Sequence, residues 1–193
     1  MNRAKVATAF AFVSLVAPKA HGASFGDWTV RHSTGGNCSL STRAALDEET
    51  YGDLGFFSSI EVGFIGTSLS GRPLELSDGS ILGPGERLFM LVQHIDLNLI
   101  PTREQVPVRV LDFLLDGEAI SEIFVKWIYL YPWRVLQKRR SDAVFESLAA
   151  GNSHEVRAKI AGEPLAETVV IGELPELHRD VANRFEQCLR EVD

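Results

Sequence analysis

Short runs of alternating apolar and polar residues dominate the chain up to about residue 140. The runs are rich in β-branched and aromatic residues and are separated by Gly, Pro or Asp-Gly, which is typical of strands joined by tight turns. They predict strands at 25–33, 38–46, 56–67, 74–76, 87–97 and 106–115, and a further strand at 119–131 that returns antiparallel after Asp116-Gly117. About seven or eight strands at this spacing predict a mainly β, single-domain antiparallel β-sandwich or jelly-roll-like fold.

After this region the pattern changes to a short helix and another hairpin. Ser141 and Asp142 are suited to cap a helix at 143–150, and a glycine follows that helix directly. Residues 154–160 and 165–171 predict two antiparallel strands around a Gly- and Pro-containing turn.

The end of the chain carries a helical pattern from Pro175 onward. The apolar side chains recur at helical spacing, which predicts a C-terminal amphipathic helix with one buried face. That face carries Leu177, Val181, Phe185, Cys188 and Leu189. The other cysteine is Cys38. In a protein that folds outside the reducing cytoplasm, two cysteines predict one disulfide, here between Cys38 and Cys188. The alternative is a pair of buried free thiols.

The first 22 residues have the pattern of a secretory signal peptide: a basic start, an apolar run at 6–17 and an exit of small residues. We expect cleavage after Gly22 or Ala23, which leaves a β-rich domain at 23–193; the alternative is an uncleaved anchoring helix. The apolar run is too short to span a membrane, which takes about 20 residues. The sequence therefore predicts a periplasmic or secreted protein with no transmembrane segment in its mature chain.

The net charge of the mature chain limits the possible partners. Removal of Arg3, Lys5 and Lys19 with the signal lowers Lys+Arg from 19 to 16 against 26 Asp+Glu, so the mature net charge is −10. Because binding to phosphate backbones needs a basic surface, this composition argues against nucleic acid as a partner.

An aromatic run is the strongest candidate for a ligand-binding surface. On an extended strand Trp127, Tyr129 and Trp133 share one face, and Arg134 follows them. Aromatic rings beside a cation can hold a sugar ring, a peptide or a lipid head group. The alternative interpretation is a central strand buried on both faces.

His94, Asp96 and Asn98 also share a face if their segment is extended. Nitrogen and oxygen ligands at that spacing form part of some zinc and manganese sites, so a metal-dependent hydrolase is an alternative function. A solvated strand face gives the same pattern, and we expect no metal, no cofactor and no catalytic residues. A carrier with an apolar cavity between sheets is the other alternative.

The stretch from Phe25 to Val30, F-G-D-W-T-V, follows the signal directly, and Cys38 opens the next predicted strand. With the short helix that ends at Gly151, the hairpin and the terminal helix, this arrangement resembles the invasion-associated locus B family of exported bacterial proteins. The resemblance implies a periplasmic β-sandwich without known catalytic residues and a link to envelope or host interaction. We therefore expect a non-enzymatic protein that binds an envelope component or a partner protein.

Overall fold

The computed structural model describes residues 24–33, 36–46, 59–76, 78–94, 111–120, 133–162 and 164–192. Within these ranges the chain forms two antiparallel sheets, a small two-stranded hairpin and two α-helices. The predicted mainly β fold with a short and a C-terminal helix is confirmed, and the jelly-roll arrangement stays a prediction. The predicted signal peptide and most of the aromatic run lie outside the described residues.

The larger sheet has five antiparallel strands in the order β1-β2-β3-β6-β9. Their bounds are β1 (Thr29–His32), β2 (Asn37–Ala45), β3 (Ser59–Thr67), β6 (Arg87–His94) and β9 (Trp133–Val135). Side chains alternate between the two faces of a sheet, and the inner face, which carries Leu40 and Phe64, is fully buried at these positions. The predicted strands at 38–46, 56–67 and 87–97 are confirmed over their described parts.

The smaller sheet has four strands in the order β11-β10-β7-β8. Their bounds are β7 (Leu111–Leu115), β8 (Glu118–Ala119), β10 (Glu155–Ile160) and β11 (Val169–Glu173). The turn between β7 and β8 has positive φ at both Asp116 (52°) and Gly117 (80°), as a two-residue hairpin requires. The predicted hairpin of β10 and β11 is confirmed by their antiparallel pairing. Its second strand begins later than predicted, because Leu165–Glu167 form a 3₁₀ turn, η3, and β11 starts at Val169.

Helix α2 (Lys138–Ala149) begins earlier than the pattern predicted, and Ser141 does not cap it. The Ser141 hydroxyl is fully buried, accepts a hydrogen bond from the Phe89 backbone N–H at 2.9 Å and donates to the Leu136 carbonyl at 3.0 Å. The prediction of a cap was wrong because this hydroxyl satisfies buried groups of β6 and the preceding loop. Lys138 at the helix start is stabilised by Asp142, one turn later, at 3.3 Å.

Helix α3 (Arg179–Arg190) begins after Pro175 rather than at it. The Pro175 carbonyl instead accepts a hydrogen bond from the indole Nε1 of Trp28 at 2.9 Å, which ties the segment before the helix to the start of the larger sheet. The predicted buried face of this segment is confirmed at Leu177, Phe185, Cys188 and Leu189, and Val181 is partly buried.

One hydrophobic core receives side chains from both sheets and both helices. Near its centre, the ring of Phe64 on β3 meets Phe89 and Phe145 edge to face, with ring centroids 5.3 and 5.2 Å apart. Phe185 of α3 lies 6.4 Å from the same ring. Such aromatic pairs add stabilisation beyond the area that they bury.

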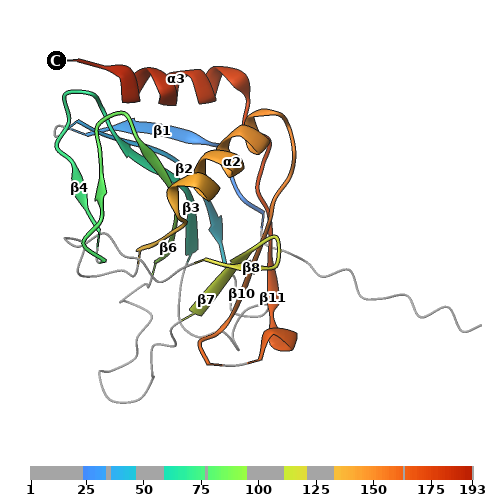
Figure 1. Cartoon of the computed structure of the whole chain (residues 1–193). Helices are drawn as coiled ribbons and strands as arrows, with labels where there is room; N and C mark the ends of the chain where they lie inside the picture. Colours follow the sequence, from blue (N-terminus) through green and yellow to red (C-terminus); the bar gives the residue numbers. More distant parts are fainter. Residues whose placement is uncertain are drawn as a thin grey trace, which may run out of the picture.

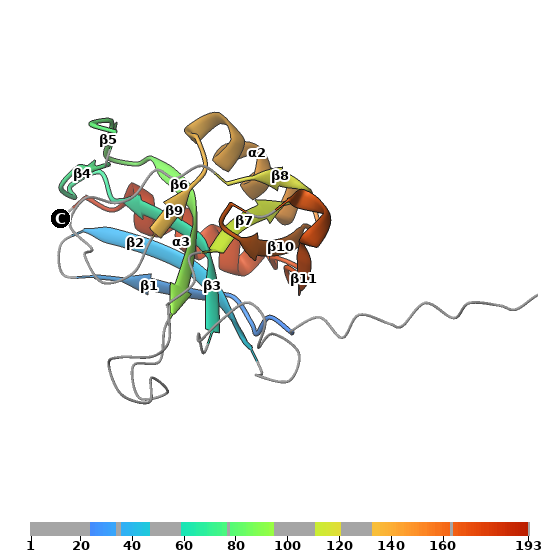
Figure 2. The same ribbon diagram turned by 90° about the horizontal axis from the view of Figure 1, so that it is seen from below.

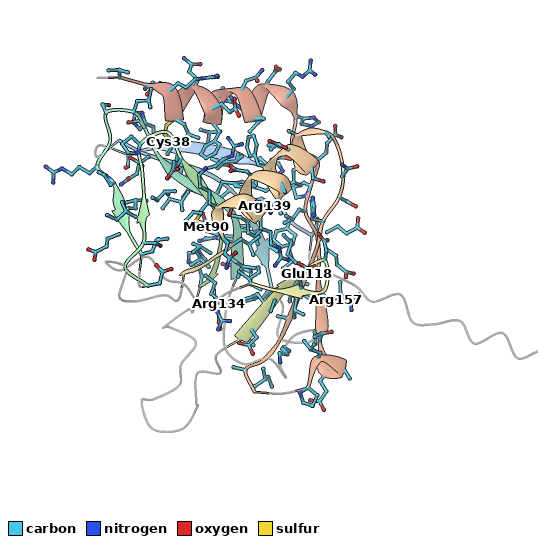
Figure 3. All side chains as sticks on the ribbon, in the orientation of Figure 1. Cys38, Met90, Glu118, Arg134, Arg139 and Arg157 are labelled. Atoms are coloured by element: carbon cyan, nitrogen blue, oxygen red, sulfur yellow. A yellow bond between two sulfur atoms is a disulfide. The ribbon has the colours of Figure 1, made fainter. Side chains whose placement is uncertain are left out.

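The predicted disulfide between Cys38 and Cys188 is confirmed, with the two Cα atoms 6.0 Å apart. It joins β2 to α3, which also contacts β1. Figure 1 shows α3 above β1 and β2 at one end of the molecule, and Figure 3 marks Cys38 beneath it. His32 and Glu191 form an ion pair at 3.2 Å beside the disulfide. Helix α3 and the residue after it are thereby fastened to β1 and β2.

A second, smaller apolar cluster lies on the opposite face of the larger sheet. There the hairpin of β4 (Leu74–Glu75) and β5 (Ile81–Leu82) packs on side chains of β3, β6 and β9. Its turn is stabilised by Asp78, whose carboxylate accepts a hydrogen bond from the Ser80 backbone N–H at 2.9 Å. The cluster consists of Ile65, Leu74, Leu76, Leu82, Leu88, Met90, Val92 and Val135.

Candidate functional site

The structure describes two of the four residues of the predicted aromatic site, Trp133 and Arg134. Trp127 and Tyr129 lie outside the described residues, and Trp133 is described by its backbone, which pairs with Val92 at the start of β9. A binding role for these aromatic side chains therefore stays a prediction.

Arg134, the cation of that predicted site, lies in the interior. Its side chain is only 2% exposed, and Nη1 donates a hydrogen bond to Asp112 Oδ1 at 3.0 Å. The guanidinium carbon also lies 5.8 Å from the centre of the Phe113 ring. Because Arg134 belongs to β9 and Asp112 to β7, the pair links the two sheets. Arg134 is labelled in Figure 3. A desolvated charge needs such a partner, so the geometry gives Arg134 a structural task.

Three polar side chains meet on the outer face of the larger sheet, the face turned away from α3. Figure 2, seen from below, shows β1, β2 and β3 in front of that helix. His94 Nε2 lies 2.9 Å from Glu61 Oε2 and 2.9 Å from Arg43 Nη2, and Arg43 Nη2 lies 3.4 Å from Glu61 Oε2. We call Arg43, Glu61 and His94 the outer-face ion cluster. Asp96 and Asn98, the predicted companions of His94, lie outside the described residues.

Strand register explains why these three residues meet. Arg43 of β2 is directly opposite Glu61 of β3. On the other side, His94 of β6 is opposite Ser59, which places it diagonally across from Glu61. Directly opposite and diagonal neighbours on one face of a sheet are within reach of long side chains. The cluster therefore follows from pairing between strands that are distant in the sequence.

The cluster holds the Glu61 carboxyl in its charged form. The hydrogen bond from His94 is the largest cause, and a hydrogen bond from Ser41 and the charges of His94 and Arg43 act in the same direction. Partial burial opposes them but does not prevail, so the pKa of Glu61 falls from 4.5 to about 2. A carboxylate of this kind accepts hydrogen bonds throughout the physiological pH range.

A hollow of about 170 Å³ adjoins the cluster on the same face. We call it the outer-face hollow. Carboxylates, guanidinium groups and hydroxyls line it together, so it offers both donors and acceptors of hydrogen bonds. Arg43 is 55% exposed, which leaves its guanidinium accessible from solvent. The lining residues are Gly26, Asp27, Thr29, Arg31, Ser41, Thr42, Arg43 and Glu61.

Among the described residues, one group of three possible metal-ligand atoms comes close together: His32, Cys38 and Cys188. Both sulfurs are joined in the disulfide, whereas metal binding requires thiolates. The geometry therefore gives this group a structural function.

The sequence pattern pointed to His94 and gave no sign of a role for Arg43 or Glu61. The signal that pointed to His94 was spacing within one strand, whereas its actual partners come from two neighbouring strands. The sequence does show a polar residue at an alternating position on each of the three predicted strands. Without the register of the strands, a contact between these residues could not be predicted.

Comparisons with models of protein families, with curated proteins and with solved structures found no match to this chain. Neither helix in the described part of the chain is long and apolar enough to cross a membrane.

Proposed function

We propose that this protein is a non-enzymatic, exported binding protein that recognises a hydroxyl-rich component of the cell envelope, such as a saccharide, in its outer-face hollow. The observation that carries the proposal is the ionised Glu61 carboxylate beside the accessible Arg43 guanidinium in that hollow.

The chemistry of the hollow matches that of a sugar hydroxyl, which donates one hydrogen bond and accepts others. A carboxylate accepts without donating, and a guanidinium donates without accepting. Asp27 and Glu61 supply the first kind of group, and Arg31 and Arg43 supply the second. Hydrogen bonds to charged groups are the stronger ones, and both signs of charge are present, which disfavours a purely anionic or cationic ligand.

The proposed compartment rests on two further observations. A disulfide is typical of proteins that fold outside the reducing cytoplasm, and this chain has one between Cys38 and Cys188. The signal-peptide pattern and the resemblance to the invasion-associated locus B family both favour the periplasm or the exterior. The envelope is the nearest source of saccharides there, and a host-interaction function would be compatible with the same surface.

Substitution of Arg43 by Met tests the proposal. Arg43 is largely exposed, so the variant should fold normally, but it lacks one of the two guanidinium groups of the hollow. The matched control is Arg157→Met, because Arg157 also has a partly exposed side chain that pairs with a glutamate, Glu155, on β10 of the smaller sheet. Figure 3 marks Arg157 at a distance from the larger sheet.

The measurement is calorimetric titration of each protein with saccharide fractions released from the envelope. We expect wild type and Arg157→Met to bind equally and Arg43→Met to bind at least about tenfold more weakly, because a hydrogen bond to a charged group is lost. Equal binding by all three proteins, or binding by none, would overturn the proposal.

A further inference from the structure

A second pocket, with none of the lining residues of the outer-face hollow, adjoins the hairpin of β4 and β5. We call it the hairpin pocket; its volume is about 240 Å³. The hairpin, the strands β6 and β9 and the start of α2 all contribute to its walls. The lining residues are Leu76, Asp78, Ser80, Ile81, Leu82, Glu86, Leu88, Val135, Leu136, Gln137 and Lys138.

The inner walls of the hairpin pocket are aliphatic. Leu82, Leu88 and Val135 belong to the second apolar cluster, and their side chains are almost fully buried. Ile81 on β5 differs from them, because it is 65% exposed although it lines the same pocket. An aliphatic side chain that stands at the edge of an apolar pocket gains contact area when a ligand enters.

The three charged side chains of the pocket, Asp78, Glu86 and Lys138, all have hydrogen-bond or ion-pair partners. Asp78 accepts hydrogen bonds from Ser80, and Glu86 accepts one from the Gly83 backbone N–H at 2.8 Å. Lys138 pairs with Glu86 at 3.6 Å and also contacts Asp142. These contacts hold the charges at the rim, so an entering group meets mainly hydrocarbon.

The size of the pocket decides what kind of apolar group fits. A cavity of about 150 Å³ with Leu, Ile and Phe walls accommodates benzene, so about 240 Å³ suits an aliphatic chain of about eight to ten carbons. A protein partner would need about 800 Å² of contact on each side, far more than the walls of one small pocket supply. A slender chain is the occupant that the pocket favours.

We propose that the hairpin pocket binds an unbranched acyl chain, with its polar end in solvent at the rim. This site is separate from the outer-face hollow and does not depend on the function proposed for it. Each buried methylene contributes about 0.8 kcal/mol, so affinity rises about fourfold per added methylene. The rise ends when the chain fills the pocket.

Titration of the wild-type protein with butanoate, hexanoate, octanoate and decanoate, followed by NMR, tests the proposal. We expect the dissociation constant to fall about fourfold per methylene up to about eight to ten carbons, with shifts at Leu82 and Leu88. Octanedioate is the control ligand: it has the same chain but a carboxylate at each end, so burial of the chain would desolvate a charge, and we expect no binding. No binding of decanoate, or equal binding of octanoate and octanedioate, would overturn the proposal.

Two variants locate the site. Ile81→Ser should weaken octanoate binding about three- to tenfold, because much of the aliphatic rim is lost. Leu165→Ser is the matched control, since Leu165 is 60% exposed on η3 and lines neither pocket. Equal weakening by both variants would contradict the assignment. Arg43→Met should bind octanoate like wild type, so failure of one proposed site is distinguishable from failure of the other.

Discussion

Removal of the disulfide is expected to cost more stability than any other single change considered for this protein. The variant replaces both Cys38 and Cys188 by Ala, because Cys38 is fully buried and a serine hydroxyl there would add a separate desolvation cost. The bridge closes a loop with a sequence separation of 150 residues. The entropy that such a closure removes from the unfolded chain corresponds to about 5 kcal/mol at 25 °C.

The measured loss should lie at about 3–5 kcal/mol, within the range found when native disulfides are removed. Urea unfolding of the variant and of the oxidised wild type gives the free energy of unfolding and its dependence on denaturant. The variant should also have a larger m-value, because its unfolded chain is less restricted and exposes more surface. Wild type reduced with a dithiol serves as the control and should unfold like the variant. A loss below 1 kcal/mol with unchanged m-value would refute the reasoning.

Three further predictions concern stability. Glu61→Gln should remove a pH-dependent part of the folding stability. The pKa of Glu61 is about 2 in the folded protein and 4.5 without its partners, so its contribution to stability is fully present above pH 4.5 and is lost as the pH falls toward 2. A pKa lowered this far corresponds to about 3 kcal/mol of stability, and solvent screening of the partly exposed cluster reduces this contribution to about 1–2 kcal/mol. If the free energies of unfolding of wild type and Glu61→Gln changed equally between about pH 5 and 3, the prediction would be contradicted. Arg87→Met should cost about 2 kcal/mol in urea unfolding, because Arg87 joins β6 to Glu186 of α3 at 3.2 Å and stacks on Phe145 of α2; a change below 0.5 kcal/mol would argue against this link. Trp28→Phe should cost about 1–3 kcal/mol by leaving a carbonyl of the segment before α3 without its indole partner, and hydrogen exchange should show that segment less protected.

Local patterns were sufficient to predict most of the described strands. The strand at 38–46 and the Asp116-Gly117 turn were correct because alternation and turn chemistry act within a few residues. The disulfide was also predictable, since a chain with only two cysteines allows one intramolecular pairing. The expected compartment and the cysteine count were therefore sufficient to predict one long-range contact without knowledge of the fold.

The errors at the helix starts have a tertiary cause. Ser141 resembles a helix cap in the sequence, but its hydroxyl serves the buried backbone of β6. Pro175 suits a first helical turn, but its carbonyl is held by Trp28, far away in the sequence. In both cases a long-range hydrogen bond prevails over a local preference that is worth only about 1 kcal/mol.

The candidate site depended still more on long-range contacts. Arg134 was grouped with the aromatic run because it follows Trp133, yet a buried partner on the other sheet, Asp112, engages it. Glu61 and Arg43 carry no motif of their own, and they meet His94 only through the register of three strands. The sequence shows which polar residues are available for such a cluster, but only the fold shows which of them are in contact.

The proposed ligand surface can be tested directly by photo-crosslinking in the native envelope. A photoreactive amino acid is placed at Thr29, which is exposed and lines the outer-face hollow, or at Glu146, which is exposed on α2. We expect irradiation to give an adduct that carries envelope saccharide at position 29 and none at position 146. No adduct at position 29, or equal adducts at both positions, would contradict the claim that the hollow recognises an envelope component.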